Sequence, residues 1–319
     1  MKNHRQVDRL ISEAKAGRRC IHSTVKSEVA ALCRRATDNG ELVRVIPGFY
    51  APREYWHGLP PPERTLHLAR AVGKEHPQWV FAGTVAAAAH GLEHQWVLHD
   101  DTITIADARR RGFRAGSGVR RLYVPDRCRR SVETVNGIRV TNVVQTVLDC
   151  ARMLAFRHAL PIADSALARG VKLDELLAGC TKLGGDMRKV MRVLKHADGA
   201  SENGGESLCR AVMIEGGFMV PSLQVVFYDP ESRRFYRVDF MWVLPDGSII
   251  VGEFDGAEKY FNPQMTGRRS IQATVQQERE REAALRRAGV RGIVRFTYDE
   301  VADATPLWNK LAQAGIPRT

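Results

Sequence analysis

Apolar and polar residues alternate most clearly in the last third of the chain, where they predict three consecutive strands. These strands are expected near residues 224–228, 234–243 and 248–254, because successive side chains of a strand point to opposite faces. The sequence Pro-Asp-Gly at 245–247 separates the second strand from the third. It is a turn sequence, since Pro presets φ and Gly accepts a positive φ. The pattern therefore predicts a hairpin.

Helical patterns flank these strands. A helix is expected from Glu206 to the glycine pair at 216–217, and a long polar helix from Ile271 to Ala288 precedes a strand over 290–298. The predicted order is helix, three antiparallel strands, helix, strand. Such an order is typical of a small layered α/β domain.

The first residues of the chain predict a small basic module. Apolar residues from Val7 to Ala14 have helical spacing, and Ser23 is a candidate cap for a second helix. Strands at 41–45 and 49–51 then flank a Pro-Gly turn. Two helices followed by a two-stranded ribbon outline a winged helix-turn-helix, in which one helix enters the major groove. A small α+β cap on the next domain is the alternative interpretation.

Three domains are expected along the chain. Three prolines at 60–62 indicate one boundary, and the small polar residues at 197–205 indicate a linker. The domains are then the winged-helix module at 1–58, an α/β middle domain at 63–198, and a last domain at 203–319. The fold class is α/β, in the form of an α+β multidomain protein.

Charge points to a polyanionic partner. The 319 residues carry a net charge of +12, which favours nucleic acid first and an anionic membrane surface second. No apolar run reaches the roughly 18 residues that span a bilayer, and the N-terminus lacks the apolar core of a signal peptide, so a cytoplasmic protein without a membrane partner is expected. Phosphate contacts explain the arginine-dense segment that begins at residue 109, and a solvated basic loop explains it equally well. The candidate DNA contacts are Arg34, Arg35, Arg44, Arg109, Arg110 and Arg111.

Three acidic residues are expected to meet at one end of the predicted hairpin. Folding the chain about Asp246 brings Asp239 opposite Glu253, and alternation puts Glu253 and Asp255 on one face. Carboxylates that converge repel one another and usually share a proton or a cation, and oxygen ligands suit Mg²⁺ or Mn²⁺. The metal site therefore predicted consists of Asp239, Glu253 and Asp255. A solvated hairpin edge with scattered acids is the alternative.

Residues 203–300 resemble the PD-(D/E)xK nuclease fold, and in particular the branch related to very-short-patch repair endonucleases, the DUF559 group. The resemblance lies in Gly205 to Ser207, Val238 to Phe240, Glu253 to Gly256 with Lys259 and Tyr260, Glu278 to Glu282, and Val294 to Thr297. It implies a restriction-endonuclease-like domain. Asp239 and Glu253 would then hold a divalent cation, with Glu206 as an extra ligand or a nearby acid.

The same resemblance assigns catalytic roles to basic residues. The Lys that the fold usually has two residues after the Glu is replaced here by Asp255, so Asp255 is either a third metal ligand or a sign of lost activity. Lys259 or Arg281 would place a positive charge near the transition state. The implied catalytic set is Glu206, Asp239, Glu253, Asp255, Lys259 and Arg281.

The front of the chain is similar to AbiEi-type antitoxins. The resemblance rests on Gly40 to Ala51, Ala86 to Leu92, Gly137 to Thr141, and Thr146 to Asp149. It implies DNA binding and a cognate toxin as partner, in a toxin-antitoxin or phage-defence system. Two hypotheses follow, a metal-dependent DNA endonuclease and a non-catalytic DNA-binding antitoxin or repressor whose nuclease fold is a scaffold. RNA as the substrate stays open.

Overall fold

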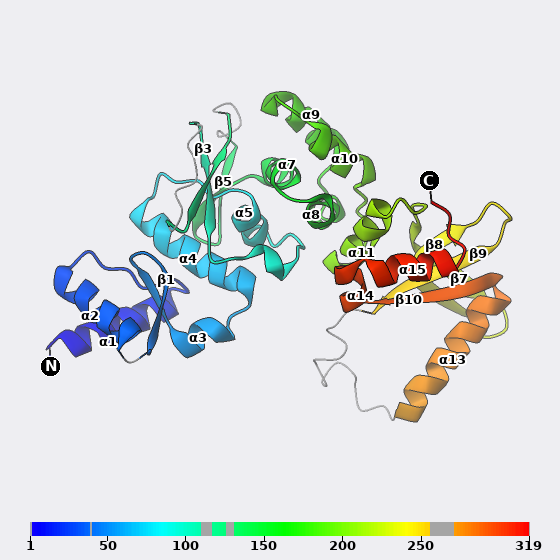
Figure 1. Cartoon of the computed structure of the whole chain (residues 1–319), viewed down its shortest axis with the longest axis horizontal. Helices are drawn as coiled ribbons and strands as arrows, with labels where there is room; N and C mark the ends of the chain where they lie inside the picture. The colour runs from blue at the N-terminus through cyan, green and yellow to red at the C-terminus, as the bar shows by residue number, and fades with distance from the viewer. Residues whose placement is uncertain (1, 39, 110–116, 126–130, 256–270, 319) are drawn as a thin grey trace. The chain divides into compact units, whose positions relative to one another are not determined.

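The chain folds into two compact units, each of which mixes helices and strands (Figure 1). The structure is a computed structural model that describes residues 2–38, 40–109, 117–125, 131–255 and 271–318. The first unit consists of Met1–Leu154 and Gly170–Leu194, and the second consists of Ala155–Arg169 and Lys195–Thr319. The expected mixed α/β fold class is confirmed at this level.

The first unit opens with two helices and a ribbon, in the order that the sequence predicted. Helices α1 (Lys2–Ala16) and α2 (Lys26–Thr37) precede strands β1 (Leu42–Ile46) and β2 (Phe49–Pro52), which pair antiparallel. Apolar residues of all four elements form one buried cluster, which includes Val7, Leu32, Leu42 and Tyr50. Burial of the apolar side of each helix and strand stabilises the module.

The predicted cap at Ser23 is wrong. Helix α2 begins after Val25, which has no side chain that caps the helix. The Ser23 hydroxyl instead accepts the backbone N–H of Val25 at 3.1 Å and donates to the Glu28 carboxylate at 2.5 Å. Ser23 therefore orders the turn that enters the helix.

The proline run starts a helix. After α3 (Arg53–Gly58), helix α4 (Pro61–Glu75) has prolines in its first turn, where a missing backbone N–H costs nothing. Leu66 and Val72 of α4 are buried in one cluster with Phe49 and other residues of the ribbon. Residues on both sides of the proline run therefore share a core within the first unit.

Short sheets and helices complete the first unit. Strands β3 and β4 pair parallel, strands β5 and β6 pair antiparallel, and Phe81 bridges to both pairs through Ile105 and Val140. The remaining elements of the first unit are α5 (Thr84–Ala89), η1 (Trp96–Leu98), β3 (Ile103–Asp107), β4 (Val119–Tyr123), β5 (Val132–Val135), β6 (Ile138–Thr141), α7 (Val143–Met153), α9 (Leu173–Leu183) and α10 (Arg188–His196). Helix α10, the last of this unit, ends within the second unit.

A buried ion pair joins the first two helices of the second unit, α8 (Phe156–Ala168) and α11 (Gly204–Glu215). Arg210 donates to the Asp164 carboxylate at 2.6 Å, and both side chains are at most 3% exposed. The expected linker at 197–205 packs against this pair, since the backbone N–H of Asp198 donates to Asp164 at 2.8 Å. Helix α8 was expected in the middle domain, and the structure places it in the second unit.

One four-stranded sheet forms the centre of the second unit. Its order is β10-β9-β8-β7, in which β7, β8 and β9 are antiparallel and β10 is parallel to β9. The strands are β7 (Ser222–Asp229), β8 (Arg234–Val243), β9 (Ile249–Asp255) and β10 (Val290–Thr297), and the helices around them are α13 (Ile271–Arg287), α14 (Tyr298–Asp303) and α15 (Thr305–Gln313). This arrangement confirms the predicted order of helix, three antiparallel strands, helix and strand.

Two apolar clusters cover the two faces of the sheet. On one face, Phe240, Trp242 and Phe254 pack with residues of α11, α14 and α15, such as Leu208. On the other face, Val238 and Val251 pack with Leu285 of α13, which Figure 1 shows away from α15. These are called below the α11 face and the α13 face.

Candidate functional site

The predicted hairpin register is confirmed. Strands β8 and β9 pair from Val243↔Ile249 to Phe240↔Gly252, and one further step in this register places Asp239 opposite Glu253. Gly247 in the turn has φ of 80°, which is the conformation that the Pro-Asp-Gly sequence predicts.

The strands twist sharply next to Asp239, and this twist separates the two acids. Leu223 and Phe240 belong to the α11 face, whereas Val225 and Val238 belong to the α13 face. In a regular strand, residues two apart would share a face. Gln224, which lies between Leu223 and Val225, has φ of 51° and supplies the change of direction.

Asp239 therefore bonds within the sheet and toward α11. Its Oδ2 accepts the backbone N–H of Phe254 at 2.8 Å, just beyond the last β8–β9 pair. Its Oδ1 accepts the Gln224 side-chain amide at 3.4 Å. The same amide nitrogen donates to Glu206 Oε2 at 2.9 Å, so Gln224 bridges the two carboxylates. Glu206, Gln224 and Asp239 are called below the carboxylate cluster.

The first turn of α11 positions Glu206. The Asn203 side chain caps the helix by accepting the N–H groups of Gly205 and Glu206, and its amide donates to Glu206 Oε1 at 2.7 Å. Gly205 allows the helix to approach β9, because a Cβ there would meet the Phe254 ring at 2.4 Å. Close packing of the helix start on β9 thus brings Glu206 to the end of the β8–β9 ladder.

Burial changes the protonation of Glu206 in the carboxylate cluster. Glu206 is 4% exposed, and its pKa is raised to about 7, mainly by burial and in smaller part by the nearby Asp239 charge. The backbone N–H of Glu202 and the Gln224 amide partly oppose this increase. Gln224 Oε1 is buried and accepts no hydrogen bond within the described residues. The cluster therefore holds two carboxylates and one amide group, whose nitrogen donates to both carboxylates. Carboxylate and amide oxygens are the ligands that hard cations prefer.

Glu253 instead belongs to a group of arginines on the α13 face. Its Oε1 accepts from Arg281 of α13, with Nε at 2.9 Å, and Arg281 also donates to the carbonyl of Arg237 at 2.5 Å. Arg295 of β10 lies 3.6 Å from Glu253 Oε2. The predicted catalytic residue Arg281 thus neutralises a predicted metal ligand.

The three predicted metal ligands do not gather in one group. Asp255 is half-buried at the end of β9, and the predicted Lys259 lies outside the described residues. Among the residues that the structure describes, no three His, Cys, Asp or Glu side chains are placed to hold a metal ion. The acids that do come together are Glu206 and Asp239.

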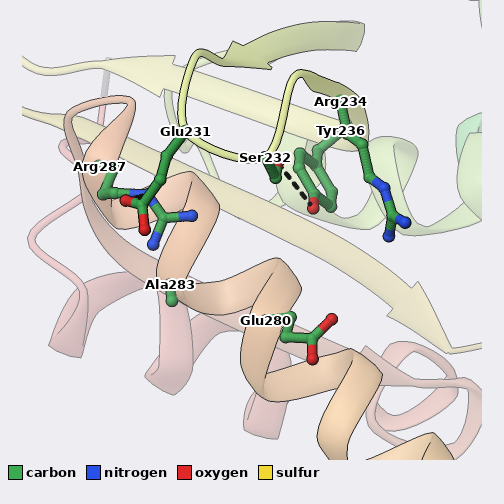
Figure 2. A pocket seen from close by; sticks show the side chains of 7 residues that line it. All are labelled: Glu231, Ser232, Arg234, Tyr236, Glu280, Ala283 and Arg287. Carbon is green, nitrogen blue, oxygen red and sulfur yellow. Dashed lines mark hydrogen bonds and ion pairs between the residues drawn. The ribbon is translucent and has the colours of Figure 1, made fainter.

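A polar pocket lies between α13 and the turn that joins β7 to β8. Figure 2 shows Arg287 and Glu231 at one end of this pocket and Arg234 at the other. The pocket is lined by Glu231, Ser232, Arg234, Tyr236, Glu280, Ala283 and Arg287. Arg287 is occupied by Asp229 at 2.6 Å and Glu231 at 3.0 Å, so its charges serve the local fold.

The predicted DNA contacts of the first unit fall into two groups. Arg35 is buried and donates to Asp8 at 2.7 Å and Glu41 at 3.2 Å, so it stabilises the module and is not available to phosphate. Arg34 on α2, Arg44 on β1 and Arg109 after β3 are exposed. The predicted contacts Arg110 and Arg111 lie outside the described residues.

Gln224 is the site residue that sequence reasoning missed. A glutamine within a strand-like run gives no chemical signal, and its role depends on a backbone conformation that the alternation pattern does not reveal. The position of Gln224 opposite Asp239 would have been a hint, because cross-strand neighbours lie close together.

In the described part of the chain, no helix is long and apolar enough to cross a membrane. No family model matches the chain, and no solved structure matches it significantly. Two relatives are the uncharacterized proteins MT2308 and Rv2248 of Mycobacterium tuberculosis, from strains CDC 1551 / Oshkosh and ATCC 25618 / H37Rv. Each is 30% identical over 234 residues, which cover 70% of this chain and 78% of the relative. At this identity and coverage, the chain belongs to the same family as these two mycobacterial proteins.

Proposed function

We propose that the protein binds DNA and that its second unit is a metal-dependent endonuclease domain of the PD-(D/E)xK kind. The observation that carries this proposal is the carboxylate cluster, in which Gln224 bridges the buried Glu206 and the half-buried Asp239 at the end of the β8–β9 ladder. The sheet order, with α11 before it and α13 between β9 and β10, agrees with the resemblance noted in the sequence. A role in toxin-antitoxin or phage defence follows from the AbiEi resemblance, with a cognate toxin as partner.

The residues of the carboxylate cluster fit Mg²⁺ or Mn²⁺. Glu206 and Asp239 supply carboxylate oxygens, and the Gln224 amide nitrogen now donates to both of them. A half-turn of this amide would replace its nitrogen with Oε1, which accepts no hydrogen bond within the described residues. A bound divalent ion would polarise a phosphate and lower the pKa of a water molecule. Glu253, the other predicted ligand, pairs with Arg281 and Arg295. We therefore propose that it positions these arginines beside the cation and does not bind the cation itself.

The chain's own groups would orient a DNA strand at this point. Arg281 lies within reach of Glu253 and of the Arg237 carbonyl, which fixes its guanidinium near the predicted site. Its Nε and Nη2 donate to Glu253 and to the Arg237 carbonyl, so a phosphate oxygen would contact the remaining terminal nitrogen. Glu206, with a pKa near 7, can hold or release a proton near neutral pH in the absence of a cation.

A non-catalytic antitoxin or transcriptional repressor is the second candidate. The observation that favours it is the neutralisation of Glu253 by two arginines, together with Asp255 at the position where the nuclease fold usually has Lys. In that case the second unit is a scaffold, and the DNA contacts lie in the first unit.

Cleavage assays separate the two candidates. Supercoiled and linear DNA, and RNA in parallel, are incubated with the protein and Mg²⁺, Mn²⁺ or chelator. The nuclease proposal expects cation-dependent cleavage that Asp239→Asn and Glu206→Gln abolish. The matched control is Asp246→Asn, an exposed acid in the β8–β9 turn that pairs with Arg291, which should leave cleavage unchanged. Absence of cleavage, with no divalent-ion shift in melting temperature, would leave the repressor as the better candidate.

DNA binding by the first unit has its own test. Changing Arg34, Arg44 and Arg109 to Ala should flatten the plot of log binding constant against log salt, by about 0.9 for each phosphate that the variant no longer neutralises. Arg188→Ala removes an exposed arginine that pairs with Asp186 and is the matched control. An unchanged slope in the triple variant would contradict a role for these three arginines.

A further inference from the structure

The β7–β8 hairpin extends as a two-stranded ribbon well beyond β9. The β8–β9 pairs cover only Phe240 to Val243, whereas the β7–β8 pairs continue to Asp229↔Arg234. One face of this ribbon is covered, since Phe227 and Tyr236 pack in the cluster that includes Leu285 of α13.

The opposite face of the ribbon is open and aromatic. It carries two cross-strand pairs, Tyr228↔Phe235 and Val226↔Arg237, and these four residues are called below the open ribbon face. Phe235 is 72% exposed, Val226 54% and Tyr228 50%. The two rings lie 5.0 Å apart with an interplanar angle of 44°. A cross-strand aromatic pair normally stabilises a hairpin through contact between its rings. In this pair at least half of each residue stays exposed and is accessible to a ligand.

The charges around this aromatic pair favour a polyanion. Arg233 is exposed at the end of the ribbon, and it has no ion pair with another described residue. Arg237 pairs with Glu202, but their side chains are 53% and 54% exposed, and such exposed pairs are weak and easily exchanged for phosphate. Rings flanked by available guanidinium groups are typical of nucleic-acid surfaces.

The open ribbon face leads to the carboxylate cluster. Along β8, Phe235, Arg237 and Asp239 follow one another at two-residue steps, and along β7 the same steps connect Tyr228 to Gln224. Phe235 is four residues from Asp239, a separation of about 13 Å at roughly 3.3 Å per residue. At roughly 3.4 Å per nucleotide of one duplex strand, this separation corresponds to about four nucleotide steps, and to fewer steps in a strand whose bases are unstacked.

We propose that the open ribbon face is a stacking platform for unpaired bases of a DNA strand whose backbone continues to the carboxylate cluster. An aromatic ring can stack on a base face only where that base has left its own stack, so the ligand class is single-stranded DNA or duplex with an extruded base. The continuation to the carboxylate cluster rests on the proposed function, whereas the stacking does not. The guanidinium groups of Arg233 and Arg237 contact phosphates on either side of the stacked base.

The test uses the full-length protein with chelator present, so that binding is measured without cleavage. Single-stranded oligonucleotides carry one 2-aminopurine, whose fluorescence falls when it stacks on an aromatic ring, and a fully paired duplex is compared. Phe235→Ala and Tyr228→Ala should each weaken single-strand binding by about 5- to 150-fold, the range for loss of one base-aromatic stack. Phe235→Trp should retain binding and quenching. The matched control is Val243→Ala, which alters an apolar residue at the other end of β8 that is 48% exposed.

The outcomes distinguish this inference from the proposed function. Quenching that depends on Phe235, in a protein that never cleaves DNA, supports the platform and refutes the nuclease. Cleavage that continues with unchanged DNA binding in Phe235→Ala refutes the platform alone. Sedimentation shows whether the open ribbon face instead joins two copies of the chain or binds another protein. If Phe235→Ala dissociates such an assembly and DNA binding is unchanged, the inference is overturned.

Discussion

Glu206 makes the stability of the second unit depend on pH in the opposite direction to an ordinary ion-paired carboxylate. Its pKa is raised to about 7 from an ordinary 4.5, first by burial and then by the Asp239 charge. Below pH 4.5 the carboxyl group is protonated in both the folded and the unfolded state, and its contribution to the free energy of unfolding is fully present. As the pH rises from 4.5 to 7, only the unfolded state ionises freely, and the contribution is lost.

The size of this effect follows from the shift. At 1.36 kcal/mol per pKa unit, the shift corresponds to at most about 3 kcal/mol, and to about 2 kcal/mol after allowing for solvent screening. Glu206→Gln keeps the shape of the side chain and removes the ionisation. We therefore expect the wild-type protein to lose about 2 kcal/mol of unfolding free energy relative to this variant between pH 5 and pH 8.

Urea denaturation followed by circular dichroism at several pH values measures the difference. Asp149 in the first unit is a second group whose pKa is raised to about 7 by burial, so both proteins are compared in an Asp149→Asn background. Parallel stability curves for the two proteins from pH 5 to pH 8 would refute the reasoning, because they would show that Glu206 ionises at its ordinary pH in the folded protein.

Three substitutions test the packing that supports the site, and urea denaturation measures each. Arg210→Met should destabilise the second unit by about 3–5 kcal/mol, because it leaves Asp164 buried without its partner, and an effect under 1 kcal/mol would contradict that role. Gly205→Ala should cost about 1–3 kcal/mol and weaken any divalent-ion shift, since the new Cβ meets Phe254. Gly247→Ala, where φ is 80° and the space is open, should cost only about 1 kcal/mol and leave that shift intact. Equal effects of the two glycine substitutions would contradict the close approach of α11 to β9.

Local patterns were sufficient to predict the strands and the register of the second unit. The alternation of apolar residues sets where β7, β8 and β9 lie, and the turn at Gly247 sets which residues of β8 and β9 oppose one another. The helix before the sheet and the helix between β9 and β10 were predicted by their spacing. These features depend on residues near one another in sequence, which is why they could be predicted.

The features that could not be predicted depend on distant partners. The segment at 197–205 has the composition of a linker, yet Asp164 on α8 accepts the N–H of Asp198 and holds it in place. Arg35 has the position of a DNA contact on the polar side of a helix, yet Asp8 and Glu41 bury it in an ion-paired group. Composition gives no information on such contacts, because they form only when the elements pack.

The separation of Asp239 from Glu253 has a different cause, which also bears on function. Gln224 has φ of 51°, a left-handed conformation that costs a residue other than glycine about 1 kcal/mol or more. Glycine at 224 would adopt this conformation without strain and would allow the same twist of the hairpin. It could not bridge Glu206 and Asp239, however, because it has no side-chain amide. In a hairpin that is only a scaffold, the strained glutamine has no role that glycine could not fill. In a cation site, its side chain holds the two carboxylates together. The conformation of Gln224 therefore favours a working site over a scaffold.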